Sequence, residues 1–162
     1  MHAAHLEPSR RIGGSPFDVA PPRRIWTINV LVVDDDEADT ALIVDALKRH
    51  PGVSATRSSD NPEQALKELA VGRISPDLVF LDINMPRMDG FTFLRRMRDI
   101  PDMAATPVVL LTTSGHSRNA EEARRSSAVS YVIKPDTYPQ LQGRLDAAIR
   151  RTISNGWRKP AC

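Results

Sequence analysis

The sequence predicts an α/β fold, a doubly wound five-stranded parallel sheet with five helices. Short apolar runs alternate with longer segments of helical periodicity along most of the 162 residues. The runs are rich in β-branched residues and too short for helices. Four of the five are almost uniformly apolar, which is typical of parallel strands covered on both faces. The predicted strands are residues 28–33, 53–58, 78–81, 108–111 and 131–133.

The second apolar run indicates an edge strand, and the segments between the runs indicate helices. Residues 53–58 alternate more between apolar and polar side chains, which indicates an edge strand. Asp36 and Asp89 can cap the helices that follow them. Asn61 can cap a helix that begins at Pro62. The fourth helical segment is mostly polar, whereas the fifth has a clear apolar stripe. The predicted helices are residues 36–49, 62–71, 90–98, 117–127 and 137–152.

Length and composition indicate one globular domain with short tails. Hydrophobic residues make up 41% of the chain and charged residues 26%, so an ordinary core can form. We predict a flexible arm over residues 1–25, the domain over residues 26–152 and a tail over residues 153–162. No apolar run approaches the roughly 20 residues of a membrane helix. The start of the chain also lacks the apolar segment of a secretory signal, so we expect a cytoplasmic protein with no membrane partner.

Charge, cysteine and histidine content argue against several other classes of site. The net charge of +2 is too small to indicate a nucleic acid partner, and the paired arginines of residues 1–25 fit a solvated segment. The single cysteine, Cys162, cannot form an internal disulfide. The histidines show no metal-ligand spacing, and we interpret His50 and His116 as surface residues. No glycine-rich phosphate-binding loop is present, so nucleotide binding is not indicated.

Polar residues stand where four of the predicted strands end. Because the carboxyl ends of parallel strands meet at one edge of a sheet, their side chains should gather into an acidic rim that also holds a lysine. The residues are Asp34, Asp35 and Asp36 after the first strand, Asp82 after the third, Thr112 after the fourth and Lys134 after the fifth. In open α/β sheets, ligands bind at this edge, so the rim is the candidate site.

Each of these residues also has an ordinary structural explanation. An aspartate after a strand often caps the next helix, and Thr112 can be a plain strand residue. Three consecutive aspartates exceed what capping needs, and like charges ~4 Å apart repel by about 4 kcal/mol at an effective dielectric near 20. A divalent cation would neutralise the cluster, and a set of oxygen ligands suits Mg²⁺. Lys134 can then balance a remaining carboxylate or an incoming phosphoryl group.

The chemistry that fits the rim is attack by a carboxylate on phosphorus, which gives an aspartyl phosphate. Phosphoryl transfer needs in-line positioning and charge neutralisation more than covalent help. Mg²⁺ and Lys134 would supply the neutralisation, and the Thr112 hydroxyl can donate to a phosphoryl oxygen. The rim therefore predicts a phosphoacceptor and not an enzyme that acts on a separate substrate.

Four stretches of the sequence resemble one known family. They are NVLVVDDDEAD, PDLVFLDINMPRMDGFTFLRRMR, TPVVLLTTSG and YVIKPDTYPQL. The acidic pair, the LDxxMPxMDG motif, the threonine and the Lys-Pro pair occur together in the required order. On these residues the chain resembles the receiver domains of bacterial response regulators, over roughly residues 28–150. The resemblance implies a flavodoxin-like receiver fold and a phosphoprotein of a two-component system.

The resemblance assigns roles to the acidic residues. Asp82 resembles the phosphoacceptor, and Asp34 and Asp35 resemble the acidic pair. The match implies that Asp35 and Asp82 bind Mg²⁺ directly and that Asp34 acts through a bound water. The backbone carbonyl of Asn84 would complete the protein ligands.

The resemblance also implies a two-state switch. Thr112 resembles the switch hydroxyl, Lys134 the lysine of the site and Tyr131 the aromatic switch residue, although Tyr131 can also be read as a plain strand aromatic. Pro135 follows Lys134, and in the family this Lys–Pro bond is cis. Phosphorylation is expected to draw Thr112 toward the phosphoryl group and to let Tyr131 rotate. The face formed by the fourth helix, fifth strand and fifth helix then changes its partners.

The implied function is a stand-alone receiver with no output domain. It would take its phosphoryl group from a sensor histidine kinase or a histidine phosphotransfer protein and act through protein contacts or as a phosphorelay carrier. The short sequences TTS and EAD resemble those of single-domain response regulators that are paired with phytochrome-type kinases. Two other hypotheses stay open, namely a receiver-like interaction module that signals without phosphate and a DNA-binding regulator that uses its basic arm. The apolar stripe of the last helix either mediates contact between two copies of the chain in a homodimer or packs on the sheet.

Overall fold

The computed structural model describes residues 26–113, 117–128 and 130–155, so the predicted arm and most of the predicted tail lie outside the described residues. Five parallel strands form one sheet in the order β2-β1-β3-β4-β5, which confirms the predicted fold class. The strands are β1 (Ile28–Val33), β2 (Val53–Ser59), β3 (Leu78–Asp82), β4 (Val108–Thr112) and β5 (Ser130–Ile133).

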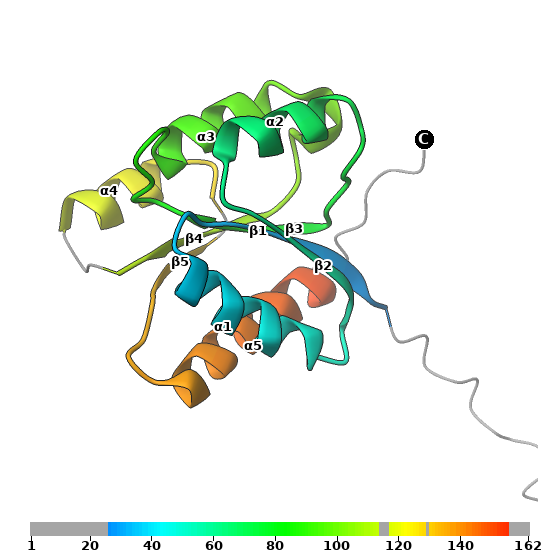
Figure 1. The fold of residues 1–162 in the computed structure, drawn as a ribbon, viewed down its shortest axis with the longest axis vertical. Coiled ribbons are helices and arrows are strands. Elements are labelled where there is room, and N and C mark those ends of the chain that lie inside the picture. Colours follow the sequence, from blue (N-terminus) through cyan, green and yellow to red (C-terminus); the bar gives the residue numbers. More distant parts are fainter. Residues whose placement is uncertain (1–25, 114–116, 129, 156–162) are drawn as a thin grey trace, which may run out of the picture.

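Helices cover both faces of the sheet. Helices α1 and α5 lie on one face, and α2, α3 and α4 lie on the other (Figure 1). The helices are α1 (Glu37–Lys48), α2 (Pro62–Ala70), α3 (Gly90–Arg98), α4 (Ser117–Arg125) and α5 (Tyr138–Ser154), with a 3₁₀ turn, η1, at Pro101–Met103. Among the described residues, no helix is both long and apolar enough to cross a membrane.

The predicted helix caps are confirmed. The Asp36 carboxylate accepts the backbone N–H of Asp39, and the Asp89 carboxylate accepts that of Thr92. The side chain of Asn61 accepts two backbone N–H groups at the start of α2, where Pro62 occupies the first turn. These contacts satisfy N–H groups that have no partner inside the helix, so each helix begins beside the end of the preceding strand.

Two apolar clusters hold the layers together, one on each face of the sheet. The stripe predicted for the last helix packs on the α1 side, with Leu141, Leu145, Ala148 and Ile149 all buried. These side chains are therefore used within the chain, which is the alternative to a dimer that the sequence left open. The other cluster contains the apolar residues of α2 and α3 and, from α4, Ala123.

The structure differs from the sequence prediction at four places. The edge position predicted for residues 53–58 is confirmed, but β5 lies at the opposite edge and its residues are only half-buried, with Ile133 exposed. An apolar run alone cannot distinguish a central strand from an edge strand covered on its faces. Helix α4 ends at Arg125, because the Ser126 hydroxyl donates to the Ala123 carbonyl and accepts the N–H of Ala128.

The remaining two differences are the end of the last helix and the position of a histidine that was interpreted as a surface residue. Helix α5 continues to Ser154, so the first two residues of the predicted tail are helical. His50 is not simply at the surface, because only 14% of its side chain is exposed and its Nε2 lies 2.8 Å from Asp146 of α5. Its Nδ1 accepts the N–H of Gly52. His116 lies outside the described residues.

Candidate functional site at the carboxyl end of the sheet

The strand ends bring the predicted acids, hydroxyl and lysine together at one edge of the sheet. Asp34 directly follows β1, Asp82 ends β3, Thr112 ends β4 and Lys134 directly follows β5. Asp34, Asp82 and Thr112 are almost completely buried, with 1%, 4% and 0% of their surface exposed. Burying two carboxylates this deeply is unfavourable unless charged partners compensate, which is typical of a functional site.

The charged partner is the ammonium of Lys134. Its Nζ lies 2.6 Å from Asp34 Oδ2, 2.8 Å from Asp39 Oδ2 and 3.1 Å from Asp82 Oδ1. Only 10% of the lysine side chain is exposed. Three carboxylates from β1, α1 and β3 thus surround one ammonium.

Asp39 was not among the predicted site residues. It lies one helical turn after Asp35, in the first turn of α1, so its side chain reaches back toward the rim. A signal was present in the sequence, since an acid four residues after the acidic pair falls on the same face of the helix. The sequence did not indicate that Lys134, 95 residues later in the chain, would lie beside Asp39.

Burial and like charges change the proton affinities of the site. Burial raises the pKa of Asp34 and of Asp82 above its usual value, although the hydrogen bonds and charge of Lys134 act in the opposite direction. Burial alone would lower the pKa of Lys134. Its contacts with Asp34 and Asp39 and the charge of Asp82 more than offset this effect and raise that pKa. The ammonium therefore stays charged at every physiological pH.

The carboxylates fit a divalent metal. Asp34, Asp35 and Asp82 each offer an oxygen, and these oxygens lie within 4.8 Å of one another. Asp35 is exposed, so the acidic pocket is open on that side. Hard oxygen ligands with an open side suit a cation that keeps several of its waters, such as Mg²⁺. Receiver domains bind a divalent metal at this pocket.

The loop after β3 carries the last predicted ligand and a close backbone approach. The N–H of Asn84 donates to Asp82 Oδ2, and the Asn84 side-chain amide lies 3.3 Å from the Thr112 hydroxyl. Gly90 closes the loop, and its N–H donates to the carbonyl of Ile83. A Cβ at Gly90 would lie 2.4 Å from the backbone oxygen of Asp82, so only glycine fits there.

The remaining predicted switch residues lie on β5 and just after it. Tyr131 is half-buried and packs against the apolar cluster on the α3 side. Pro135 follows Lys134 at the edge of the site. The described residues contain no cis peptide bond, so the cis Lys134–Pro135 bond implied by the resemblance is wrong for this structure. The trans isomer is also the one that an X–Pro bond prefers by about 0.5–1 kcal/mol.

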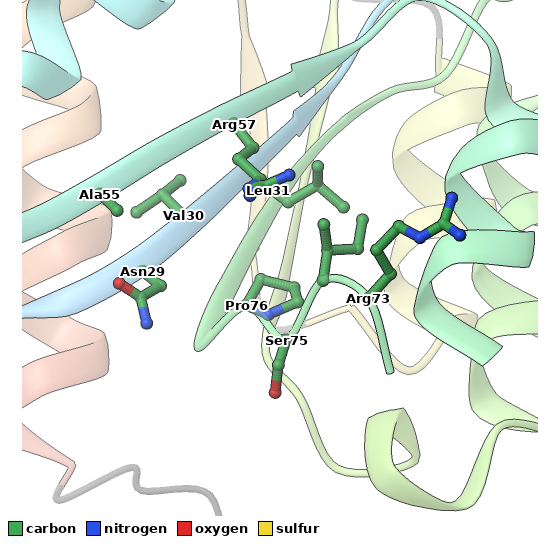
Figure 2. A pocket seen from close by; sticks show the side chains of 9 residues that line it. Asn29, Val30, Leu31, Ala55, Arg57, Arg73, Ser75 and Pro76 are labelled. Atoms are coloured by element: carbon green, nitrogen blue, oxygen red, sulfur yellow. The ribbon is translucent and has the colours of Figure 1, made fainter. Parts of the chain in front are cut away.

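Two hollows of the surface differ in their position relative to the site. A groove of about 680 Å³ borders the rim between the β3–α3 loop and α4, and Asp35, Asn84 and Arg95 line it. A pocket of about 250 Å³ lies at the opposite, amino end of β1 and β2 (Figure 2). There the side chain of Arg73 extends away from that of Arg57, so the two cations do not converge. Of these two hollows, the first lies at the acidic rim.

Comparison with known proteins agrees with this geometry. Protein-glutamate methylesterase/protein-glutamine glutaminase 6 of Anaeromyxobacter dehalogenans is 38% identical over 112 residues, which are 68% of this chain and 30% of that protein. The chain thus spans about a third of the length of this curated relative.

Two solved structures share the fold. The phosphorylated cyanobacterial phytochrome response regulator RcpA has a TM-score of 0.72 and 24% identity, with 80% of this chain and 96% of that chain covered. The Mn²⁺-bound response regulator Rcp1 has a TM-score of 0.68 and 24% identity, with 83% and 99% covered. At this identity they support the fold alone.

The family comparison covers most of the described chain. Residues 30–146 match the family described as the response regulator receiver domain. The match includes Asp34, Asp82, Thr112 and Lys134, which the structure brings together at the rim. The resemblance seen in the sequence is therefore confirmed, and the chain belongs to the response regulator receiver domain family.

Proposed function

We propose that this chain is a stand-alone phosphorylation switch that takes a phosphoryl group on Asp82. The observation that carries the proposal is the environment of that carboxylate. Asp82 is buried at the end of β3, 3.1 Å from the ammonium of Lys134 and within reach of Asp34 and Asp35. An ordinary structural aspartate does not need three other charged groups around it.

The chemistry is transfer between a phosphohistidine and a carboxylate. A carboxylate oxygen of Asp82 forms a bond to phosphorus, and the P–N bond breaks with its electron pair moving to the imidazole nitrogen of the donor. Lys134 balances the charge of the incoming phosphoryl oxygens, and the Thr112 hydroxyl donates to one of them. Mg²⁺ held by Asp34, Asp35, Asp82 and the backbone carbonyl of Asn84 would neutralise the carboxylates and the phosphoryl group.

The switch follows from the contacts of Thr112. Its hydroxyl lies 3.3 Å from the Asn84 side-chain amide before phosphorylation, and a phosphoryl group on Asp82 offers a stronger, charged acceptor. Movement of Thr112 leaves space at β4, which Tyr131 of the neighbouring β5 can fill. The groove beside α4 then changes shape, so a partner can distinguish the two states.

The proposal extends to partners and location. The donor is a sensor histidine kinase, with the phytochrome type as the first candidate, or a histidine phosphotransfer protein. Asp35 and Asn84 line the groove along the β3–α3 loop, and we propose that a phosphohistidine side chain approaches Asp82 from there. The chain then signals by protein contacts or passes the phosphoryl group on, within the cytoplasm and without acting on a separate substrate.

The test is phosphorylation by acetyl phosphate and Mg²⁺, followed by intact-mass measurement. The wild type should gain one phosphoryl group, and Asp82→Asn should gain none. Asp102→Asn, an exposed acid far from the rim, serves as the matched control and should behave like the wild type. A wild type that stays unmodified, or an Asp82→Asn variant that is still modified, would reject the proposal. The first outcome would favour an interaction module that works without phosphate.

A further inference from the structure

The hydrogen bonds of Lys134 are divided unequally among its three carboxylates. An ammonium has three N–H donors. Two of them are hydrogen-bonded, to Asp34 at 2.6 Å and to Asp39 at 2.8 Å. Asp82, at 3.1 Å, is the most distant of the three. The third donor therefore faces Asp82, where a phosphoryl group would be attached.

The first turn of α1 is held against the rim, so Asp39 is a fixed anchor. The Asp36 carboxylate accepts the N–H of Asp39 at 2.8 Å, and the Thr40 hydroxyl contacts the carbonyl of Asp34 at 3.4 Å. The Asp39 side chain is 34% exposed, whereas that of Lys134 is 10% exposed. Asp39 is thus the more exposed of the two hydrogen-bonded carboxylates, whereas the Asp34 side chain is buried.

We infer that Asp39 is a positioning residue for phosphoryl transfer, because together with Asp34 it holds the Lys134 ammonium so that its third donor faces Asp82. This inference rests on the proposed function. Without Asp39, only Asp34 and the more distant Asp82 would hold the ammonium, which lies at the end of a flexible four-carbon chain and could then shift from its position beside Asp82. Loss of preorganisation lowers the rate of the transfer step and leaves donor binding unchanged.

A purely structural role for Asp39 predicts a different result. If Asp39 only fastened α1 to β5, its loss would lower the stability of the protein and leave the rate of phosphorylation of the folded chain unchanged. Glu37 provides a matched control, because it is another acid in the first turn of α1 and is exposed to solvent.

The experiment compares wild type, Asp39→Asn, Asp39→Glu and Glu37→Gln. In metal-free protein labelled with ¹⁵N-lysine, the Lys134 ammonium signal should shift in Asp39→Asn and stay in place in Glu37→Gln. With acetyl phosphate and Mg²⁺, Asp39→Asn should lower the maximal rate constant roughly tenfold at an unchanged half-saturating donor concentration. Asp39→Glu keeps the charge and should recover part of the rate.

The outcomes separate this inference from the proposed function. If the wild type is phosphorylated and Asp39→Asn reacts at the same maximal rate, the inference is wrong and the proposed function stands. An unchanged Lys134 ammonium signal in Asp39→Asn would also overturn it. If the wild type takes up no phosphoryl group at all, the proposed function fails, and the positioning role fails with it.

Discussion

Helices α1 and α4 both border the acidic rim, but they are held to the sheet in different ways. Helix α1 buries Ile43, Ala46 and Leu47 in the apolar cluster that it shares with α5. Among the described side chains of α4, only Ala123 is buried. A helix with one small buried side chain gains little from packing, so α4 should open more easily than α1.

The polar contacts repeat this contrast. Helix α1 and the short segment after it contact the β5–α5 region. The contacts are Asp39 with Lys134, Asp45 with Tyr138, and His50 with Asp146. The α4 side depends on Arg98 of α3. The rim therefore has a rigid side, which holds the lysine, and a loosely packed side, which is suited to move.

Arg98 fastens the segment that follows α4. Its guanidinium donates to the Ser127 hydroxyl at 2.8 Å and to the Ser127 carbonyl at 3.1 Å. The same side chain donates to the carbonyls of Met103 and Thr106, at 3.0 and 2.6 Å. A single side chain therefore joins the end of α3, the start of β4 and the end of the α4 segment.

The largest effect should come from the core of α1. Ile43→Ala removes a side chain that is 1% exposed and should lower the free energy of unfolding by about 3 kcal/mol. The counterpart in α4, Ala123→Gly, should cost about 1 kcal/mol. Urea denaturation measures both values. Equal losses would contradict the contrast between the two helices.

The next effect should come from Arg98. Arg98→Ala leaves the carbonyls of Met103 and Thr106 without this donor and should cost about 2 kcal/mol. Hydrogen exchange should show protection lost in α4 and the residues after it, with α1 unchanged. Arg96→Ala, at an exposed position of α3, is the matched control. Equal loss of protection in α1 and α4 would mean that Arg98 supports the whole fold and not one side.

Asp82→Asn should instead stabilise the metal-free protein, by about 1 kcal/mol, because it removes a buried charge beside other carboxylates. Burial raises the pKa of Asp82 above its ordinary value of 3.8. The stability that this group contributes is therefore fully present below pH 3.8 and is lost as the pH rises through the folded pKa.

The gain in the free energy of unfolding from Asp82→Asn should consequently be small near pH 4 and grow as the pH rises. Denaturation at several pH values in the presence of a chelator measures it. Thr112→Val, which alters the same rim without removing a charge, controls for changes in packing. A gain that does not depend on pH would show that packing, and not charge, is responsible.

The smallest effect should come from the contact between α1 and α5. The Tyr138 hydroxyl donates to Asp45 and, together with Arg49, lowers the pKa of that carboxyl. Tyr138→Phe should raise the pKa of Asp45 toward its usual value, with little change in the fold. Carbon-detected NMR titration of the Asp45 carboxyl measures the shift. An unchanged pKa would mean that the Tyr138 hydroxyl does not stabilise the ionised Asp45 carboxylate.

Much of the site was predictable because it depends on local pattern and on one rule of sheet geometry. Asp34, Asp82, Thr112 and Lys134 could be identified as neighbours because each stands where a buried apolar run ends and parallel strands end at one edge. Asp36, Asn61 and Asp89 could be identified as caps because capping involves residues within one turn. Gly90 was part of the family motif, although its contact with Asp82 was not predictable.

Several of the contacts that sequence reasoning missed join residues far apart in the chain. Asp39 and Lys134 are separated by 95 positions, and His50 and Asp146 by 96. Arg98 is one of several basic residues at the end of α3, and only its geometry distinguishes it from Arg95 and Arg96. Periodicity and motifs carry no information on which long side chain meets which partner, because that depends on how the helices dock.

The alternation of strands and helices, the edge where the charges gather and the identity of the acid among them could all be read from the sequence alone. These follow from periodicity and from the direction of parallel strands, which are local properties of the chain. That α1 supplies a second anchor for Lys134 and that Arg98 fastens the segment after α4 could be seen only in the folded protein. The reason is that both contacts join separate elements, whose relative positions are set when the layers pack.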